Sequence, residues 1–193
     1  MIQRRWQLCF VFLVFTQASL SAIAETGLIS LQEALKTRGT VIMLRHALAP
    51  GFGDPSNFQV NDCSTQRNLD ARGREQSKSI GIQFKTFGYA AEVVHSSPWC
   101  RCLETARLMD IGRVESFKGL GSFFDGHVDR GVTLKLLSDK LLTISNRGES
   151  PAIMVTHQVV ISAITKLVTS SGEAILYDPK RDISLRIRLT END

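Results

Sequence analysis

Short runs of bulky apolar residues alternate along this chain with segments whose apolar positions follow a helical period. Runs of about four such residues are typical of strands buried on both faces, and they occur at Val41–Leu44 and Ala152–Val155. The segment Glu92–Val94 is expected to form another short strand. The alternation of apolar and polar residues over Ile183–Leu189 predicts a strand at the edge of the sheet.

The intervening segments predict helices, and several of them begin with recognisable start signals. Ser30 with Glu33 three residues later is the signature of a capping box. Asp70 is a suitable N-cap, and Pro98 suits a first helical turn. The helices are expected at residues 30–37, 70–84, 97–109, 133–144 and 159–167.

Two segments are expected to lack regular structure. Residues 47–68 form a long polar loop, and loops of this length in compact domains are usually functional. Residues 111–131 contain five glycines. Strands interleaved with helices over the rest of the chain predict an α/β fold, a three-layer α/β/α sandwich around a mostly parallel sheet.

The first 24 residues are typical of a targeting segment. Arg4 and Arg5 give a positive start, an apolar run over Leu8–Phe15 follows, and Ala22-Ile23-Ala24 offers a small-residue cleavage site. We therefore expect a secretory signal peptide cut after Ala24, one domain over residues 25–193, and a secreted or periplasmic location. The alternative is an uncleaved membrane anchor. No second long apolar segment follows, so no stable membrane insertion is expected after cleavage.

Charge and cysteine content narrow the partners and the covalent framework. The formal net charge is +4, and no long run of lysine and arginine occurs, so nucleic acid is not an expected partner. Three cysteines follow the targeting segment: Cys63, Cys100 and Cys102. In an exported protein an odd count leaves at least one thiol free or bridged to another chain. A bridge from Cys63 to Cys100 or to Cys102, and three unpaired thiols, are both open.

Arginine and histidine residues follow three of the predicted strands. Arg45 and His46 end the first, Arg101 follows the second, and His157 ends the third. Ligands of α/β sheets bind beyond the carboxyl ends of the strands, so these side chains are expected to form one cationic pocket. Guanidinium groups bind phosphate oxygens in a bidentate way, and an imidazole nitrogen is a nucleophile. This pattern favours phosphoryl transfer.

Four blocks of sequence, in order, resemble the histidine phosphatase superfamily, also called phosphoglycerate mutase-like. The blocks are Leu44-Arg45-His46-Ala47; Thr65-Gln66-Arg67-Asn68-Leu69 with Gly73 and Gln76; Ser96-Ser97-Pro98 with Arg101 and Thr105-Ala106; and Val155-Thr156-His157. Together they extend over nearly the whole of the chain that follows the targeting segment. The resemblance implies a phosphoglycerate mutase-like fold in a small exported branch without a large cap domain.

The resemblance also implies a role for each histidine of the pocket. His46 is the expected nucleophile and forms a covalent phosphohistidine, while His157 stabilises the transferring group. Neutral imidazole is the better nucleophile, and its second ring nitrogen needs a hydrogen bond to hold it. We expect the acceptor to be a backbone carbonyl in residues 47–51.

The arginines are expected to take the place of a metal ion. The resemblance implies that Arg45 and Arg101 bind the phosphate oxygens, and no metal or organic cofactor is expected. Arg67, in the long loop, is either a third phosphate-binding residue or an ordinary surface residue. Charge on a transferring phosphoryl group can be neutralised by arginines, which fits a pocket without an obvious carboxylate cluster.

The alkoxide leaving group needs a proton, and the loop before the 133–144 helix offers three candidate acids. They are Asp125, His127 and Asp129. Asp125 is the first choice because two neighbouring phenylalanines predict an apolar setting, which raises the pKa of a carboxyl group. A good leaving group, such as a phosphohistidine or an acyl phosphate, needs no strong acid.

The expected function is that of an exported phosphoric monoester hydrolase of the histidine acid phosphatase type. It would hydrolyse phosphomonoesters or phosphoramidates through phosphorylated His46. Residues 110–150 leave little material for a cap, so an open site is expected. Such a site admits a phosphorylated small molecule, an envelope sugar phosphate or a phosphoprotein. The alternative is a non-catalytic phosphate-binding module of the same fold, which would keep the arginines but has no use for the pair His46 and His157.

Overall fold

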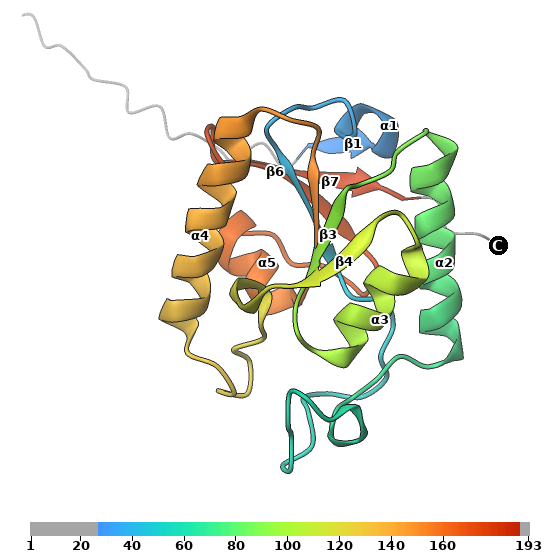
Figure 1. The fold of residues 1–193 in the computed structure, drawn as a ribbon, viewed down its shortest axis with the longest axis vertical. Coiled ribbons are helices and arrows are strands. Elements are labelled where there is room, and N and C mark those ends of the chain that lie inside the picture. The colour runs from blue at the N-terminus through green and yellow to red at the C-terminus, as the bar shows by residue number, and fades with distance from the viewer. Residues whose placement is uncertain (1–26, 190–193) are drawn as a thin grey trace, which may run out of the picture.

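A computed structural model describes residues 27–189, in which strands and helices alternate (Figure 1). The strands are β1 (Leu28–Ser30), β2 (Val41–Arg45), β3 (Val93–Ser96), β4 (Arg113–Ser116), β5 (Ala152–Thr156), β6 (Ala174–Asp178) and β7 (Ile183–Arg188). The helices are α1 (Leu31–Ala34), α2 (Ala71–Thr86), α3 (Cys100–Met109), α4 (Arg130–Arg147), α5 (Gln158–Thr165) and the short 3-10 helices η1 (Cys63–Thr65) and η2 (Lys118–Leu120). The predicted signal peptide lies outside the described residues.

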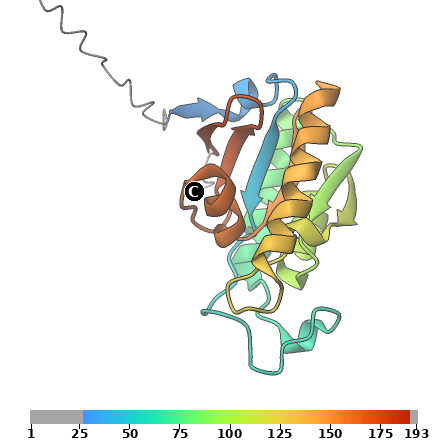
Figure 2. The same cartoon turned by 90° about the vertical axis from the view of Figure 1, so that its left-hand side faces the viewer.

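The strands of residues 27–189 form one sheet in the order β1-β7-β6-β2-β5-β3-β4. Within it β6 runs antiparallel to both neighbours, and the other neighbouring strands pair in parallel. In Figure 1 the helices α4 and α5 lie on one side of the sheet and α2 and α3 on the other, and in Figure 2 the strands spread across the view behind α4. The predicted α/β sandwich around a mostly parallel sheet is confirmed.

Side chains along the central strand alternate between two apolar cores, one on each face of the sheet. Ile42 and Leu44 pack in the core that α2 and α3 cover, whereas Val41 and Met43 pack in the core under α4 and α5 (Figure 1). All four side chains are completely buried. Burial of each side chain stabilises the fold by about 1.5–3 kcal/mol. A strand that is buried on both faces therefore has apolar residues at consecutive positions, which is the pattern that predicted this strand.

Two glycines allow α2 to approach its neighbours very closely. A β-carbon at Gly73 would lie 2.0 Å from the carbonyl oxygen of Leu48, and one at Gly81 would lie 1.9 Å from that of Met109. The N-cap Asp70 also accepts a hydrogen bond from the Gly73 amide, at 2.7 Å. The start of α2 is therefore held directly against the loop that follows β2.

The strand Ile183–Leu189 was predicted at an edge of the sheet, and this prediction is wrong. β7 lies between β1 and β6, and the edges of the sheet in residues 27–189 are β1 and β4. The prediction failed because β1 and β6 were not identified. Within β7 only Ile187 is buried, and the other residues of the strand are intermediate or exposed.

Two further boundaries differ from the sequence prediction. The segment 111–131 was expected to be irregular, but it contains β4 and η2. Pro98 was expected in a first helical turn, but α3 begins at Cys100 with Trp99 as its N-cap. The Ser30–Glu33 capping box is confirmed, on the very short helix α1. Among residues 27–189, no helix combines the length and apolar character that crossing a membrane requires.

Candidate active site

The carboxyl ends of three neighbouring parallel strands bring the predicted histidines together. β5 pairs in parallel with β2 on one side and with β3 on the other. His46 follows β2 and His157 follows β5, and their ring centroids lie 5.4 Å apart. Both rings are buried, with 2% and 4% of each residue exposed. The sheet therefore creates an enclosed pair of imidazoles.

His46 has one ring nitrogen fixed and the other unoccupied. Its Nδ1 lies 2.8 Å from the carbonyl oxygen of Ala47, which accepts the Nδ1 proton. This is the backbone acceptor predicted within residues 47–51. No described residue forms a hydrogen bond with His46 Nε2, so the tautomer set by Ala47 leaves a lone pair on that atom. The Ala47 amide in turn donates to Thr105 Oγ1 at 3.1 Å, which holds the turn in place.

His157 is oriented by a buried serine at the end of β3. Its Nε2 lies 2.8 Å from Ser97 Oγ and 3.5 Å from the Cys102 thiol. A hydroxyl that donates to Nε2 leaves the ring proton on Nδ1, which has no hydrogen-bond partner among the described residues. His157 Nδ1–H is then available to donate to an anion.

Both histidines are held in the neutral form. Burial is the main cause that lowers the pKa of His46, to about 3, and the positive charges of Arg101, Arg67 and Arg45 lower it further. The pKa of His157 is also well below its usual value, mainly because its ring is buried and next because of Arg101. At neutral pH, His46 Nε2 is consequently unprotonated.

Arg45 is bound to the protein through one of its nitrogens. Its Nη1 donates to the carbonyl oxygen of Thr169 at 2.5 Å and to Gln158 Oε1 at 3.3 Å. Its Nε is buried and has no partner within residues 27–189. A buried, unpaired donor is costly. The edge of the guanidinium formed by Nε and Nη2 is therefore available for an anion.

Arg101 forms a buried ion pair with Asp54, a residue that the sequence analysis did not single out. Nη1 and Nη2 of Arg101 donate to the two carboxylate oxygens at 2.7 and 3.1 Å. The side chains are only 3% and 2% exposed. Nη1 also donates to the carbonyl oxygen of Arg67, at 3.2 Å, whereas the buried Nε finds no partner in the described part of the chain.

Arg67 is half-buried at the same site and is not an ordinary surface residue. Its Nε donates to the carbonyl oxygen of Gly53 at 3.0 Å, and its Nη1 donates to that of Ala49. The guanidinium thereby ties together the two ends of the 49–53 segment. Its charge acts on His46, as the lowered pKa of that ring shows.

The three candidate acids occupy different positions. Asp125 is exposed at the rim, and one of its carboxylate oxygens accepts the Asp54 amide at 3.2 Å. The apolar enclosure predicted for Asp125 is absent, because Phe124 beside it is also exposed. His127 is exposed and stacks on Phe58, with centroids 4.1 Å apart. Asp129 caps α4 by accepting from the Val132 amide, so it serves the helix.

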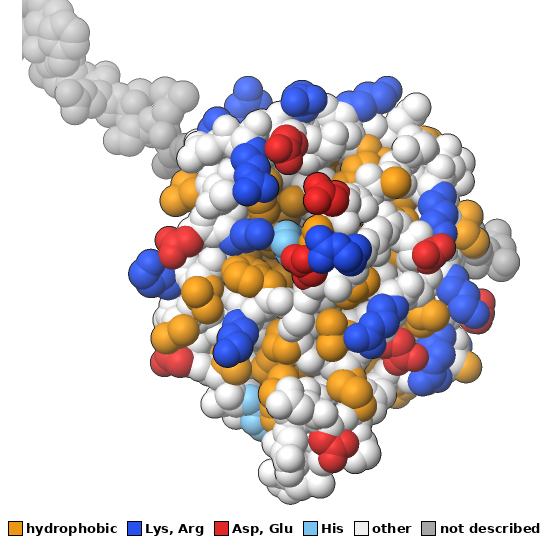
Figure 3. All heavy atoms as spheres, viewed as in Figure 1, with side chains coloured by type: hydrophobic (Ala, Val, Ile, Leu, Met, Phe, Trp, Pro, Cys, Tyr) orange, Lys and Arg blue, Asp and Glu red, His pale blue; other side chains and the backbone are white. Residues whose placement is uncertain are grey.

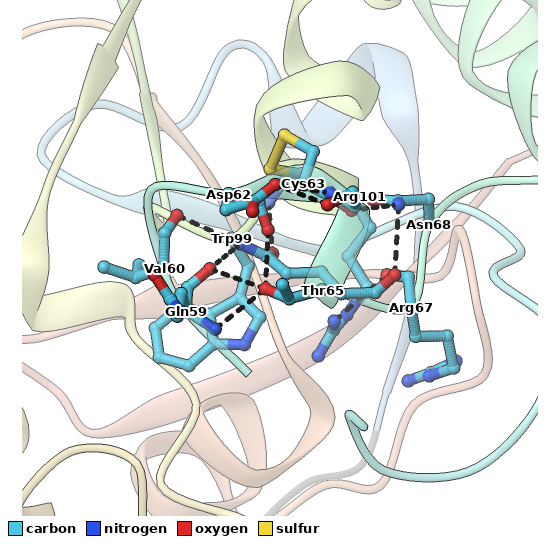
Figure 4. Close-up of a disulfide and its surroundings, with 12 residues drawn as sticks. Gln59, Val60, Asp62, Cys63, Thr65, Arg67, Asn68, Trp99 and Arg101 are labelled. Atoms are coloured by element: carbon cyan, nitrogen blue, oxygen red, sulfur yellow. Dashed lines mark hydrogen bonds between the residues drawn. A yellow bond between two sulfur atoms is a disulfide. The ribbon is translucent and has the colours of Figure 1, made fainter. Parts of the chain in front are cut away.

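A disulfide joins the long loop to the start of the helix that carries Arg101. Cys63 is bonded to Cys100, and Cys102 is a buried free thiol, so the alternative of three unpaired thiols is wrong. Gln66 Oε1 accepts the Cys100 amide at 2.9 Å beside the bridge. In Figure 4 the side chains of Arg67 and Arg101 extend in the same direction, away from the disulfide.

The surface near the site is partly aromatic. Phe52, which is 88% exposed, meets Phe124 edge-on, with ring centroids 5.0 Å apart. On the face shown in Figure 3, lysine and arginine side chains are interspersed with acidic ones and do not form one continuous patch. His95 lines a separate cavity of about 580 Å³ between β3, β4 and α4, and neither His46 nor His157 lines this cavity.

Three solved structures of phosphatases are similar to this one. The protein histidine phosphatase SixA complexed with tungstate matches with a TM-score of 0.55 and 17% identity, over 76% of this chain and 93% of that chain. Phosphoserine phosphatase from Entamoeba histolytica, in complex with 3-phosphoglyceric acid, gives 0.51 and 15%, over 80% and 98%. A mycobacterial glucosyl-3-phosphoglycerate phosphatase with inorganic phosphate gives 0.52 and 15%, over 72% and 88%.

Similarity is confined to the level of structure. No protein-family model matches the sequence, and no curated protein matches it. Each match nevertheless covers most of this chain and most or nearly all of the chain of the solved structure. The chain therefore has the fold of the histidine phosphatase, or phosphoglycerate mutase-like, superfamily.

Proposed function

We propose that this protein is an exported phosphatase that hydrolyses phosphomonoesters or phosphoramidates through a covalent phosphohistidine on His46. One observation carries the proposal. Arg45 and Arg101, beside the buried histidine pair, each use Nη1 for bonds within the protein and leave a buried Nε–H that finds no acceptor among residues 27–189. Buried donors of this kind need a partner. A phosphoryl group has three oxygens that can accept hydrogen bonds from these N–H groups.

The first chemical step is attack on phosphorus by the lone pair of His46 Nε2. A nitrogen–phosphorus bond forms while the bond from phosphorus to the leaving oxygen or nitrogen breaks. The guanidinium groups and His157 Nδ1–H donate to the oxygens of the transferring group, whose charge is spread over them in the transition state. The neutral state of His46 matches this role, because a protonated ring has no lone pair on Nε2.

In the second step water attacks the phosphorus and His46 leaves with its lone pair restored. The proton given to the leaving group and the proton taken from water pass through one acid–base residue. We assign this role to Asp125, since it contacts the backbone of Asp54, whose side chain binds Arg101. His127 is the second choice, because it stacks on Phe58 close by.

The open rim supports a range of substrates. Residues between α3 and α4 contribute a short strand, a 3-10 helix and a loop, and no further domain covers the site in the described part of the chain. The similar proteins include a protein histidine phosphatase and a phosphoserine phosphatase. We propose a phosphorylated small molecule, an envelope sugar phosphate or a phosphoprotein as the substrate, with residues 1–24 directing export.

Hydrolysis of 4-nitrophenyl phosphate by the purified full-length chain, with a metal chelator present, tests the proposal. Wild type should release nitrophenol, and His46→Ala should lose at least about a thousandfold in kcat/KM. His95→Ala is the matched control, because it removes an imidazole outside the site, and it should retain activity. Equal rates for wild type and His46→Ala would contradict the proposal. Phosphate binding without turnover would favour the non-catalytic module.

A further inference from the structure

We propose that Asp54 is a positioning residue that aims the Arg101 guanidinium at the phosphoryl group, and this role rests on the proposed function. The residue lies 47 positions before Arg101 in sequence, within the long loop. None of the four sequence blocks includes it. Its carboxylate nevertheless binds both terminal nitrogens of the Arg101 side chain.

The carboxylate of Asp54 accepts hydrogen bonds from four donors. Two come from Arg101, at 2.7 and 3.1 Å, and the other two from Trp99 Nε1 and the Arg67 amide, both at 3.0 Å. The indole and the amide belong to two different segments of the chain. Asp54 therefore has a fixed position of its own, from which it can fix the orientation of Arg101.

The pairing leaves one particular edge of the Arg101 guanidinium unused. An arginine side chain has five N–H donors in a rigid plane. Both hydrogens of Nη1 are taken, by Asp54 and by the Arg67 carbonyl, and one hydrogen of Nη2 is taken by Asp54. The hydrogens that remain are those of Nε and the second one of Nη2, which lie side by side. These two donors match two oxygens of one phosphoryl group.

This geometry argues against Asp54 as an internal blocker of the site. A blocking carboxylate would occupy the donors that phosphate needs, and phosphate would have to displace it. Here the carboxylate binds the end of the guanidinium, and the buried Nε remains without a partner among the described residues. Phosphate can therefore bind while the ion pair stays intact.

Two other roles for Asp54 also fit poorly. A proton donor must hold a proton. Burial favours the protonated form of Asp54, but the charge and hydrogen bonds of Arg101, together with the Arg67 amide and the Trp99 indole, outweigh it and lower the pKa of the carboxyl group. A cation site is suggested by Asp54, Asp125 and His127, whose ligand atoms lie within 4.8 Å of one another. Both oxygens of Asp54 already face the positive charge of Arg101, which opposes a metal ion there.

The loop around Asp54 is built to place this side chain. Gly51 and Gly53 have φ values of 96° and 67°, in the left-handed region that favours glycine. Arg67 binds the carbonyl oxygen of Gly53, and Asp125 accepts the Asp54 amide. Both bonds hold the peptide unit that joins Gly53 to Asp54, so the backbone directly before the Asp54 side chain is fixed.

Binding of inorganic orthophosphate, measured by calorimetry on the full-length chain, distinguishes positioning from simple charge. Removal of a nearby negative charge should by Coulomb's law tighten the binding of an anion. Positioning predicts the opposite sign. Asp54→Ala should weaken binding by about 10- to 100-fold, the range expected for loss of an aligned charge-assisted hydrogen bond. Asp54→Asn should fall between wild type and Asp54→Ala, since its amide oxygen accepts one bond.

Two further variants complete the test. Asp54→Glu keeps the charge but lengthens the side chain by one methylene, so it displaces Arg101 and should also weaken binding and raise KM. Because Asp54→Glu keeps the ion pair with Arg101, this variant should fold even under conditions in which Asp54→Ala is unfolded. Asp139→Asn removes an exposed charge that pairs with Lys135, and it should leave orthophosphate binding unchanged.

Each outcome identifies which proposal fails. If wild type binds orthophosphate and the folded Asp54 variants bind it equally or more tightly, the positioning role is wrong and the proposed function stands. If wild type binds no orthophosphate, the proposed function is wrong, and the role of Asp54 falls with it. Weaker binding by Asp54→Glu with the charge preserved supports positioning.

Discussion

Ser97 Oγ lies 2.8 Å from Nε2 of His157, and both residues are buried. The two residues come from the carboxyl ends of adjacent strands, β3 and β5, so the register of the sheet sets this contact. When this hydroxyl donates to Nε2, the ring proton of His157 lies on Nδ1. An enclosed histidine can thereby act as a hydrogen-bond donor without carrying a positive charge.

Ser97→Ala should lower kcat by about tenfold, because loss of one buried hydrogen bond costs about 1–1.5 kcal/mol and His157 would lose its fixed tautomer. Steady-state kinetics with a phosphomonoester measures the effect. Ser96→Ala is the matched control: its hydroxyl is equally buried but donates to the Ser97 carbonyl, so kcat should be retained. Equal losses in both variants would show that the effect of Ser97 is only structural.

The rate of phosphoryl transfer to His46 should remain insensitive to acid far below the ordinary pKa of histidine. The pKa of His46 is lowered to about 3, so the reactive neutral ring persists as pH falls from 7 to about 4. An unperturbed histidine, with a pKa of about 6.5, would lose tenfold per pH unit over most of this range. Burst kinetics at saturating 4-nitrophenyl phosphate measures the step. A decline centred near pH 6.5 would show that the nucleophile is not this buried ring.

Reduction of the Cys63–Cys100 disulfide should destabilise the protein and loosen the loop that contains Asp54 and Arg67. The bridge closes a loop with a sequence separation of 37 residues, for which the chain-entropy estimate is about 4 kcal/mol. Urea unfolding with and without reductant measures the change, and orthophosphate binding should weaken in parallel. In the double variant Cys63→Ser, Cys100→Ser, reductant should have no further effect. An unchanged midpoint in the reduced wild type would contradict this structural role.

Much of the fold was predictable because burial leaves a direct trace in the sequence. β2 and β5 are enclosed on both faces, which demands consecutive apolar residues, and both were found. β4 is a short edge strand of mixed polarity and gives no such run. β6 does contain the apolar run Ala174–Tyr177, which was not recognised, and this omission also misplaced β7 at an edge.

From the strands alone, the site was predictable where residues end a strand or follow it directly. Arg45 ends β2, while His46 and His157 follow β2 and β5, so the order of strands brings them together. Arg67 and Arg101 were identified through the resemblance of the sequence blocks that contain them. Asp54 was missed because its loop has no periodicity, and only the folded chain brings residue 54 to Arg101. The apolar setting expected around Asp125 was wrong, since neighbours in sequence do not determine burial in a loop.

The central claim is that His46 becomes phosphorylated during turnover. The most direct measurement begins by mixing the full-length chain with a radiolabelled activated phosphate ester and trapping the labelled protein. The stability of the trapped phosphoryl group is then compared in acid and in base. Wild type and His95→Ala should carry an acid-labile, base-stable phosphoryl group, as expected for phosphohistidine, and His46→Ala should carry none. A label that persists on His46→Ala, or ester hydrolysis by wild type with no trapped label, would contradict the account.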